Sequence, residues 1–218
     1  MPKFSLLILC AGFGNRMLDL TKNTPKPLLK IGNKTLLGNA IDFFKDIGCD
    51  EIFINTHYLH NKFEKYLQKN YNNYSVNLVY EPLILGTGGA VKNIFNYSKN
   101  VNLCVINSDI LWNKANKLDI LKFLEDFNEI KFCKILLSKK NNFFGLKKSH
   151  GDFSITNNII TNWNLGNDIN FYSGIQIVSR TIFKETNRTF SMNKIWNCLI
   201  IDKKLEGSII TSKILHLG

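Results

Sequence analysis

The stretch "ILCAGFGNRM" at residues 8–17 decides the predicted fold, because it joins an apolar run to a glycine-rich turn. Residues 4–10 are apolar in the way of a strand that is buried on both faces of a parallel sheet. Gly12 and Gly14 supply the first two glycines of a Gly-x-Gly-x-x-Gly dinucleotide loop. The third glycine would stand at position 17, where the chain has Met17, preceded by Arg16.

This glycine turn is suited to holding phosphate groups. Gly12 and Gly14 permit positive φ angles and let backbone N–H groups point at a ligand. Arg16 adds a planar fork of donors that matches phosphate oxygens. The loop therefore predicts a polyphosphate gripped partly by side chains, and the alternative is an ordinary tight connection.

Length and composition favour one folded cytoplasmic domain. The chain has 218 residues, of which 44% are hydrophobic, and it has no apolar run of the roughly 18 residues that span a membrane. We interpret the first apolar segment as a buried strand and not as a signal peptide. The five cysteines contain no C-x-x-C pair, so we expect buried free thiols in a reducing compartment and neither zinc nor disulfides.

The formal net charge of +11 raises the question of nucleic-acid binding. The lysines are scattered among asparagine and isoleucine and form no single stripe. We therefore expect no nucleic-acid partner and favour a small anionic substrate.

Strands and helices alternate over the first part of the chain. The pattern predicts strands at 51–55, 75–80, 102–107 and 131–138, and helices at 34–47, 59–68, 89–97 and 116–127. Such alternation indicates a Rossmann-like, mostly parallel sheet flanked by helices. Beyond residue 140 we expect short strands and one helix at 191–204. The fold class is α/β. We expect a single domain over residues 1–218, with a ligand-binding parallel half at 1–139 and a smaller β-rich part at 140–218.

Three unusual segments follow predicted strands, at the edge where open parallel sheets bind ligands. They are "CAGFGNRM", "EPLILGTGGA" at 81–90 and "INSD" at 106–109. Asp109 directly follows a strand, which suits a hard cation such as Mg²⁺ or, alternatively, a helix N-cap. Gly86, Thr87 and Gly88 allow the backbone to approach a flat ring, although an ordinary helix entry gives the same pattern.

Lys26 stands between Pro25 and Pro27, in the same predicted loop as Arg16. A proline on each side fixes the backbone around one cation, as a phosphate site would require. The alternative is a rigid surface turn. Because we place Lys26 on a surface loop, we expect Lys26→Ala to reduce turnover and to leave thermal stability nearly unchanged.

Together these segments resemble the sugar-1-phosphate nucleotidyltransferases, or nucleotide-sugar pyrophosphorylases. The family signature is similar to "LCAGFGNRM" and "TPKPLL", its nucleobase loop to "LGTGGA", its metal motif to "INSD" and its sugar-side segment to "FYSGI" at 171–175. The resemblance covers residues 4 to about 180. Some features are similar to N-acetylmuramate-1-phosphate uridylyltransferases and others to heptose- and mannose-1-phosphate guanylyltransferases, so the base and the sugar stay open.

The resemblance implies transfer of a nucleotidyl group from a nucleoside triphosphate to a sugar 1-phosphate, with release of pyrophosphate, on the way to cell-envelope polysaccharide. It implies Mg²⁺ as the cofactor, bound by Asp109. The implied roles are catalytic for Arg16, Lys26 and Asp109, nucleotide-binding for Ala11, Gly12, Gly14, Asn15, Gly86, Thr87 and Gly88, and sugar-phosphate-binding for Asn107, Ser173 and Gly174. The phosphate nucleophile is already charged at neutral pH, so no general base is needed.

The C-terminal segment departs from the family pattern. The nearest match to the family's Trp-x-Asp-x-Gly is "ILHLG", which has His216 in place of a second metal-binding Asp. Imidazole is a poorer ligand for Mg²⁺. The chain is therefore expected either to continue naturally beyond Gly218 or to be a weak enzyme, and a nucleotide-sugar-binding regulatory homologue is the alternative function. An NAD-dependent oxidoreductase lacks support because the third glycine is missing, and a glycosyltransferase because "SDI" is not D-x-D.

Overall fold

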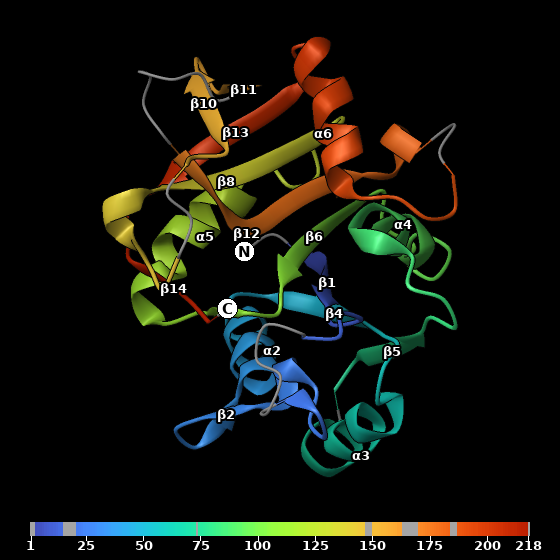
Figure 1. Cartoon of the computed structure of the whole chain (residues 1–218). Coiled ribbons are helices and arrows are strands. Elements are labelled where there is room, and N and C mark those ends of the chain that lie inside the picture. Colours follow the sequence, from blue (N-terminus) through green and yellow to red (C-terminus); the bar gives the residue numbers. More distant parts are fainter. Residues whose placement is uncertain are drawn as a thin grey trace.

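The computed structural model describes residues 3–14, 21–72, 74–146, 150–162, 170–183 and 187–217. Its centre is a nine-stranded sheet in the order β10-β11-β13-β8-β12-β6-β1-β4-β5 (Figure 1). The strands are β1 (Phe4–Leu9), β4 (Cys49–Thr56), β5 (Val76–Tyr80), β6 (Asn102–Asn107), β8 (Cys133–Lys139), β10 (Phe153–Thr156), β11 (Ile159–Asn162), β12 (Asn170–Ser179) and β13 (Leu205–Ile210).

The predicted parallel arrangement is confirmed for β1, β4, β5 and β6, the first four strands of this sheet along the chain. β1 is parallel to both β4 and β6, and β4 is parallel to β5. β1 occupies the middle of this group, and its residues 4–8 are buried, as an apolar run of this kind predicts. The carboxyl ends of β1, β4, β5 and β6 therefore point to one edge of the molecule.

β12 breaks the parallel order, which the sequence pattern did not predict. It lies between β6 and β8 and is antiparallel to both. Nine of its ten residues are buried, which is the pattern of a central strand with neighbours on both sides. The sheet is thus mixed. Residues 140–218 supply four of its strands, and residues 1–139 supply the others.

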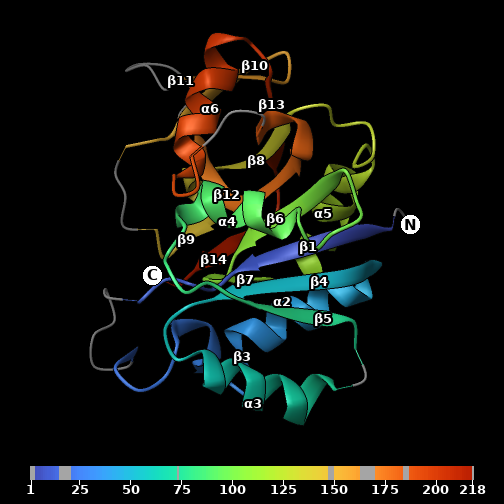
Figure 2. The same cartoon turned by 90° about the vertical axis from the view of Figure 1, so that its right-hand side faces the viewer.

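Helices cover both faces of the sheet (Figure 2). α2 (Leu36–Asp46), α3 (His60–Tyr71) and α5 (Lys117–Leu124) contribute to the hydrophobic cluster that contains Leu6 and Ile8. α4 (Gly86–Ile94) and α6 (Met192–Ile201) contribute to the cluster on the opposite face, which contains Leu7. Successive side chains of a strand point to opposite faces, so β1 serves both clusters.

Smaller elements complete the fold. Two hairpin strands, β2 (Lys30–Ile31) and β3 (Lys34–Thr35), precede α2, and a second sheet contains β7 (Ile110–Leu111), β14 (Ile214–His216) and β9 (Phe143–Phe144) in the order β7-β14-β9. The 3₁₀ turns are η2 (Lys26–Leu28), η3 (Lys114–Asn116), η4 (Lys140–Asn142) and η5 (Arg180–Phe183). No helix among the described residues is long and apolar enough to cross a bilayer.

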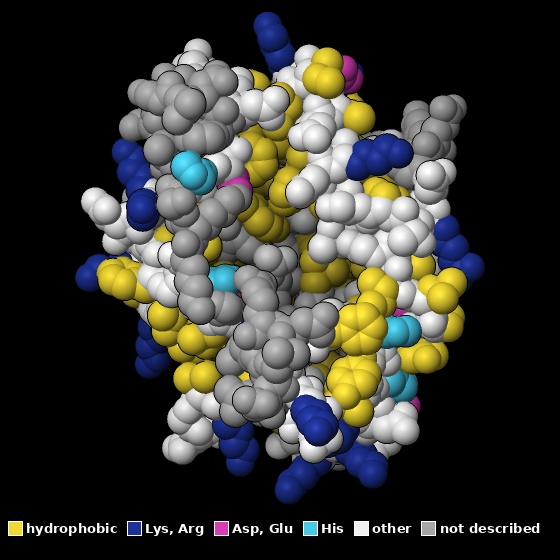
Figure 3. Space-filling view, in the orientation of Figure 1, with side chains coloured by type: hydrophobic (Ala, Val, Ile, Leu, Met, Phe, Trp, Pro, Cys, Tyr) yellow, Lys and Arg dark blue, Asp and Glu magenta, His cyan; other side chains and the backbone are white. Residues whose placement is uncertain are grey.

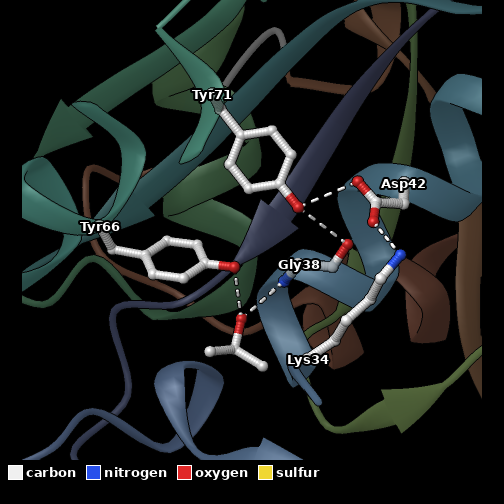
Figure 4. A network of polar contacts seen from close by, with 6 residues as sticks. Lys34, Gly38, Asp42, Tyr66 and Tyr71 are labelled. Carbon is white, nitrogen blue, oxygen red and sulfur yellow. Dashed lines mark hydrogen bonds and ion pairs between the residues drawn. The ribbon is translucent and has the colours of Figure 1, made fainter. Parts of the chain in front are cut away.

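Polar contacts fasten α3 onto the start of α2 (Figure 4). Thr35 caps α2 by accepting a hydrogen bond from the Gly38 N–H at 2.9 Å, and its hydroxyl donates to the Tyr66 oxygen at 2.7 Å. The Tyr71 hydroxyl lies 3.0 Å from Asp42 Oδ1. These contacts fix α3, the helix that follows β4, against α2.

The cysteines are free thiols, as predicted. Cys10, Cys49, Cys104 and Cys133 are buried, whereas Cys198 is exposed on α6, contrary to the expectation that all five are buried. Burial raises the pKa of Cys49 to about 12 and that of Cys104 well above its ordinary value. These two thiols are therefore unreactive core residues.

Candidate active site

The three segments that follow the strands converge on one cavity, as the sequence predicts. The cavity measures about 430 Å³ and lies at the carboxyl ends of β1, β4, β5 and β6. Its lining includes Ala11, Gly12, Gly14, Lys26, Asn55, Glu81, Gly86, Thr87, Asn107, Ser108 and Asp109. Asn15 and Arg16 lie outside the described residues.

The glycine turn has the backbone that its sequence implies at Gly14. This residue has φ +70°, and its carbonyl accepts a hydrogen bond from the Thr21 hydroxyl at 3.1 Å. A Cβ added at Gly14 would lie 3.2 Å from a Thr21 methyl group, whereas one at Gly12 would meet nothing within 4 Å. Gly14 is thus needed for the turn itself, and the space beside Gly12 is open to a ligand.

Lys26 and Asp109 form an ion pair inside the cavity. Lys26 Nζ lies 3.0 Å from Asp109 Oδ2, and the two side chains are 11% and 17% exposed. The flanking prolines place Lys26 in the short 3₁₀ turn η2, with Pro27 buried. The expectation of a lysine on a surface loop is therefore wrong, because the ammonium group turns inward to the carboxylate.

His216 reaches the same carboxylate from the end of the chain. β14 pairs antiparallel with β7, which sets His216 opposite Ile110 and places its Nε2 3.4 Å from Asp109 Oδ2. The Leu217 N–H also donates to the Asp109 carbonyl at 2.9 Å. Residues 214–217 of the segment "ILHLG" thus lie beside the predicted metal motif, as the comparison with the family pattern implied.

The environment of Asp109 keeps its carboxylate charged. Burial alone raises the pKa of Asp109, but the hydrogen bond from His216 and the charges of Lys26 and His216 outweigh it and hold the pKa at about 2. Asp109 Oδ1 is buried and has no hydrogen-bond partner, and the same holds for His216 Nδ1. Within the described residues, no group of three or more His, Cys, Asp or Glu side chains gathers to hold a metal.

A buried pair, Asn55 and Glu81, was missed by sequence reasoning. The Asn55 side chain accepts a hydrogen bond from the Cys10 N–H at 2.9 Å and donates to Glu81 Oε1 at 3.0 Å. The Leu85 N–H lies 3.5 Å from Glu81 Oε2. Burial raises the pKa of Glu81, which is 1% exposed, above its ordinary value. The signal available in the sequence was a carboxylate at a strand end, as at Asp109.

The glycines of "LGTGGA" pack closely against another segment of the chain. Gly86 and Thr87 line the cavity, but Gly88 is buried and its N–H donates to the Phe190 carbonyl at 3.0 Å. A Cβ on Gly88 would collide with the Phe190 ring. The backbone is therefore approached at Gly88 by another segment of the chain, and Gly88 is not among the residues that line this cavity.

A second cavity of about 470 Å³ adjoins the first. Leu9, Thr87 and Asn107 line both cavities. The remainder of the second lining comes from β10, β11, β12 and α6, together with Asp152 before β10 and Ser191 before α6. Figure 3, in the orientation of Figure 1, shows the surface hollowed between α6 and β10. Asn107 therefore stands where the two cavities meet.

Ser173 and Gly174 lie in the strand beneath these cavities and line neither of them. The Ser173 side chain is fully buried, and its hydroxyl donates to the Leu136 carbonyl at 2.6 Å. Gly174 has φ +89° in the irregular stretch of β12, and a Cβ there would lie 2.8 Å from Ile110. Both residues shape β12 next to the site, and Tyr172 and Gln176 are the β12 residues that face the second cavity.

Solved structures share this fold across nearly the whole chain. HddC from Yersinia pseudotuberculosis, solved in complex with GMP-PN, has a TM-score of 0.76 at 22% identity and covers 98% of this chain and 93% of its own. A putative glucose-1-phosphate thymidylyltransferase from Bacillus anthracis has a TM-score of 0.78 at 20% identity, with 98% and 89% covered. The fold is that of the nucleotidyltransferases and pyrophosphorylases.

The sequence comparison agrees with this class. The chain belongs to the Nucleotidyl transferase family, whose model matches residues 5–157. A D-glycero-alpha-D-manno-heptose 1-phosphate guanylyltransferase from Aneurinibacillus thermoaerophilus is 34% identical over 106 residues, which are 49% of this chain and 46% of that protein. An N-acetylmuramate alpha-1-phosphate uridylyltransferase from Neisseria meningitidis is 36% identical over 108 residues, 48% and 46% of the two chains. The chain spans about half the length of such curated relatives.

Proposed function

We propose that this protein transfers a guanylyl group from GTP to a sugar 1-phosphate and releases pyrophosphate. The buried Lys26–Asp109 pair beside the glycine turn is the observation that carries the proposal. It sets a cation and a carboxylate with one free oxygen at the strand ends where phosphate groups are bound. The relatives named above are all transferases, which favours catalysis over the regulatory alternative.

The arrangement addresses the main difficulty of this reaction, which is that two anions must meet. A phosphate monoester is largely doubly charged at neutral pH and attacks without a general base. Lys26 supplies positive charge at the wall of the cavity, and we assign Arg16 to the departing pyrophosphate. We assign the phosphates and the ribose to the turn with Ala11, Gly12 and Gly14, which lines the cavity together with Gly86 and Thr87. Asn15, which follows this turn in the sequence, is assigned to the same role.

The residues present fit one divalent cation. Asp109 Oδ1 is buried without a partner, and a carboxylate oxygen is the ligand that Mg²⁺ prefers. Asp109 would hold the ion together with substrate phosphates and water. Bound there, Mg²⁺ would neutralise phosphate charge.

Glu81 favours guanine as the base. Glu81 is one of the residues that line the cavity, and its carboxylate has lone pairs beyond those used by Asn55 and Leu85. Guanine offers two adjacent donors, N1–H and the N2 amino group, which match the two oxygens of a carboxylate, whereas uracil offers one N–H between two carbonyls. The guanylyltransferase relative and the GMP-PN complex point in the same direction.

The second cavity supports a neutral polyhydroxy sugar. Asn162, Asn193 and Asn197 line it with amides, and Trp196 adds an aromatic edge. The Tyr172 hydroxyl in this lining is buried without a hydrogen-bond partner, so it is available to a sugar hydroxyl. We accordingly assign the nucleotide to residues 1–139 and the sugar mainly to 140–218, with Asn107 between them. A cytoplasmic location and a role in cell-envelope polysaccharide belong to the same proposal.

The test is pyrophosphate release by the purified protein with Mg²⁺, using GTP or UTP and heptose, mannose or N-acetylmuramate 1-phosphate. We expect GTP and a neutral sugar to be preferred. Asp109→Asn should lower turnover by at least about 10²-fold, and Asp46→Asn, which alters an exposed ion pair, should not. Normal turnover in folded Asp109→Asn would show that Asp109 has no catalytic role. Preference for UTP would refute the assignment of Glu81 to guanine recognition.

A further inference from the structure

Residues 190–192 close onto the loop at 85–89 by reciprocal backbone bonds. The Phe190 N–H donates to the Leu85 carbonyl at 3.0 Å, and the Phe190 carbonyl accepts from the N–H groups of Gly88 and Gly89 at 3.0 and 3.1 Å. We refer to these two segments, Leu85–Gly89 and Phe190–Met192, as the clasp. It joins the loop that lines the first cavity to the segment that opens α6.

The glycines of the loop make this close contact possible, because a Cβ at their positions would clash with the facing segment. Gly86 has φ +71°, and a Cβ on it would lie 2.6 Å from the Phe190 carbonyl oxygen. Cβ atoms on Gly88 and Gly89 would collide with the Phe190 ring and with the Arg188 carbonyl. A side chain at any of the three positions would therefore separate the two segments.

Thr87 adds the one side-chain bond in the clasp that the described residues show. Its Oγ1 accepts a hydrogen bond from the Met192 N–H at 2.9 Å. Met192 is the first residue of α6, and Ser191 caps the helix. Thr87 also lines both cavities, whereas Ser191, Met192 and Asn193 line only the second. Thr87 therefore lines the first cavity and is hydrogen-bonded to the first residue of the helix that lines the second cavity.

We propose that Thr87 is a positioning residue that couples nucleotide binding to sugar-phosphate affinity through the start of α6. The inference rests on the proposed function. A β-branched side chain has few χ1 rotamers, so a nucleotide that packs on the 85–89 loop also fixes the direction of the hydroxyl. The N-terminal turn of α6 is then ordered before the sugar phosphate arrives, which lowers the entropy cost of binding it.

Thr87→Val tests this directly, because it keeps the shape and removes the acceptor. Leaving the Met192 N–H unpaired should raise the KM for the sugar 1-phosphate about 5- to 20-fold. The rise in the sugar KM should exceed any change in the affinity for GTP, measured by calorimetry, by at least about fivefold, because the lost bond acts through the start of α6. Thr87→Ser retains the hydroxyl but is not β-branched, so its sugar KM should lie between the values of the wild type and of Thr87→Val. Thr181→Val, which removes a hydroxyl bonded to the Lys131 carbonyl at 2.7 Å beyond the far end of β12, is the matched control.

Hydrogen exchange of the Met192 amide tests the coupling independently, because it needs no sugar phosphate. GTP alone should slow exchange of the Met192 amide by about fivefold or more in the wild type and should not do so in Thr87→Val. An unchanged sugar KM in Thr87→Val, or an equal rise in the KM for GTP, would overturn the coupling while the proposed function stands. A wild-type protein that releases no pyrophosphate with any sugar phosphate would overturn the proposed function itself, and the coupling with it.

Discussion

Replacement of Lys26 by methionine should destabilise the protein as well as inactivate it. The ammonium group lies 3.0 Å from Asp109 Oδ2 in a largely buried setting. At an effective dielectric constant of 20, the attraction across 3.0 Å is about 5–6 kcal/mol before desolvation is counted. Removal of one partner from a buried pair costs about 3–5 kcal/mol. Because His216 still faces the carboxylate, we expect the lower end, about 3 kcal/mol.

The assay is urea unfolding and thermal unfolding in the presence of chelator, so that no cation replaces the ammonium group. For a chain of this size, a loss of about 3 kcal/mol lowers Tm by roughly 6–12 °C. Lys117→Met is the control, because Lys117 pairs with Asp46 at 2.7 Å but the two side chains are 35% and 68% exposed. An exposed pair of this kind contributes about 0–1 kcal/mol.

A double variant separates loss of the ion pair from loss of packing. Asp109→Asn introduced into Lys26→Met removes the carboxylate that has lost its cation, so we expect it to recover about 1–2 kcal/mol. If Lys26→Met unfolds at the same urea concentration as Lys117→Met, the buried pair contributes nothing to stability. The reasoning would then be refuted, because Lys26 would contribute no more to the free energy of unfolding than an exposed lysine does.

Two further predictions concern His216 and Glu81. His216→Asp should lower the Mg²⁺ concentration needed for half-maximal pyrophosphate release, because it brings a second oxygen ligand beside Asp109; an unchanged midpoint would show that position 216 is not part of the metal site. Burial raises the pKa of Glu81, so the folded state holds this proton more tightly than the unfolded state, and wild-type stability should fall as pH rises from about 4.5 through the folded-state pKa. Glu81→Gln should abolish this dependence in urea unfolding measured at several pH values, and a parallel pH profile in the two proteins would contradict it.

Local patterns account for what the sequence predicted well. An apolar run followed by glycines indicates a buried strand and a turn over a few residues, and β1 with Gly14 has that form. The alternating strands and helices from β4 to β8 were predictable for the same reason, with helix ends shifted by a few residues. Asp109 and Lys26 were singled out because each has an unusual neighbourhood in the sequence.

The features that the sequence did not predict are contacts between segments that lie far apart along the chain. The pairing of β12 with β6 joins residues about 70 positions apart, and periodicity contains no information on which strands are neighbours. The Lys26–Asp109 pair joins residues 83 positions apart, so a lysine in a proline-rich loop looked exposed. In the same way, glycines in "LGTGGA" indicate that something approaches the backbone, but they do not say whether it is a ligand or Phe190.

The position of His216 shows where a weak sequence signal becomes decisive once topology is added. The match of "ILHLG" to a family pattern covers five residues and has little weight by itself. β14 pairs with β7, which begins directly after Asp109, so the register of two short strands brings His216 Nε2 to 3.4 Å from the carboxylate. The candidate site is therefore closed by the last strand of the described chain. It follows that the lysine loop and the C-terminal strand act on a single carboxylate, and that a change in either of them alters the charge that Asp109 presents to phosphate.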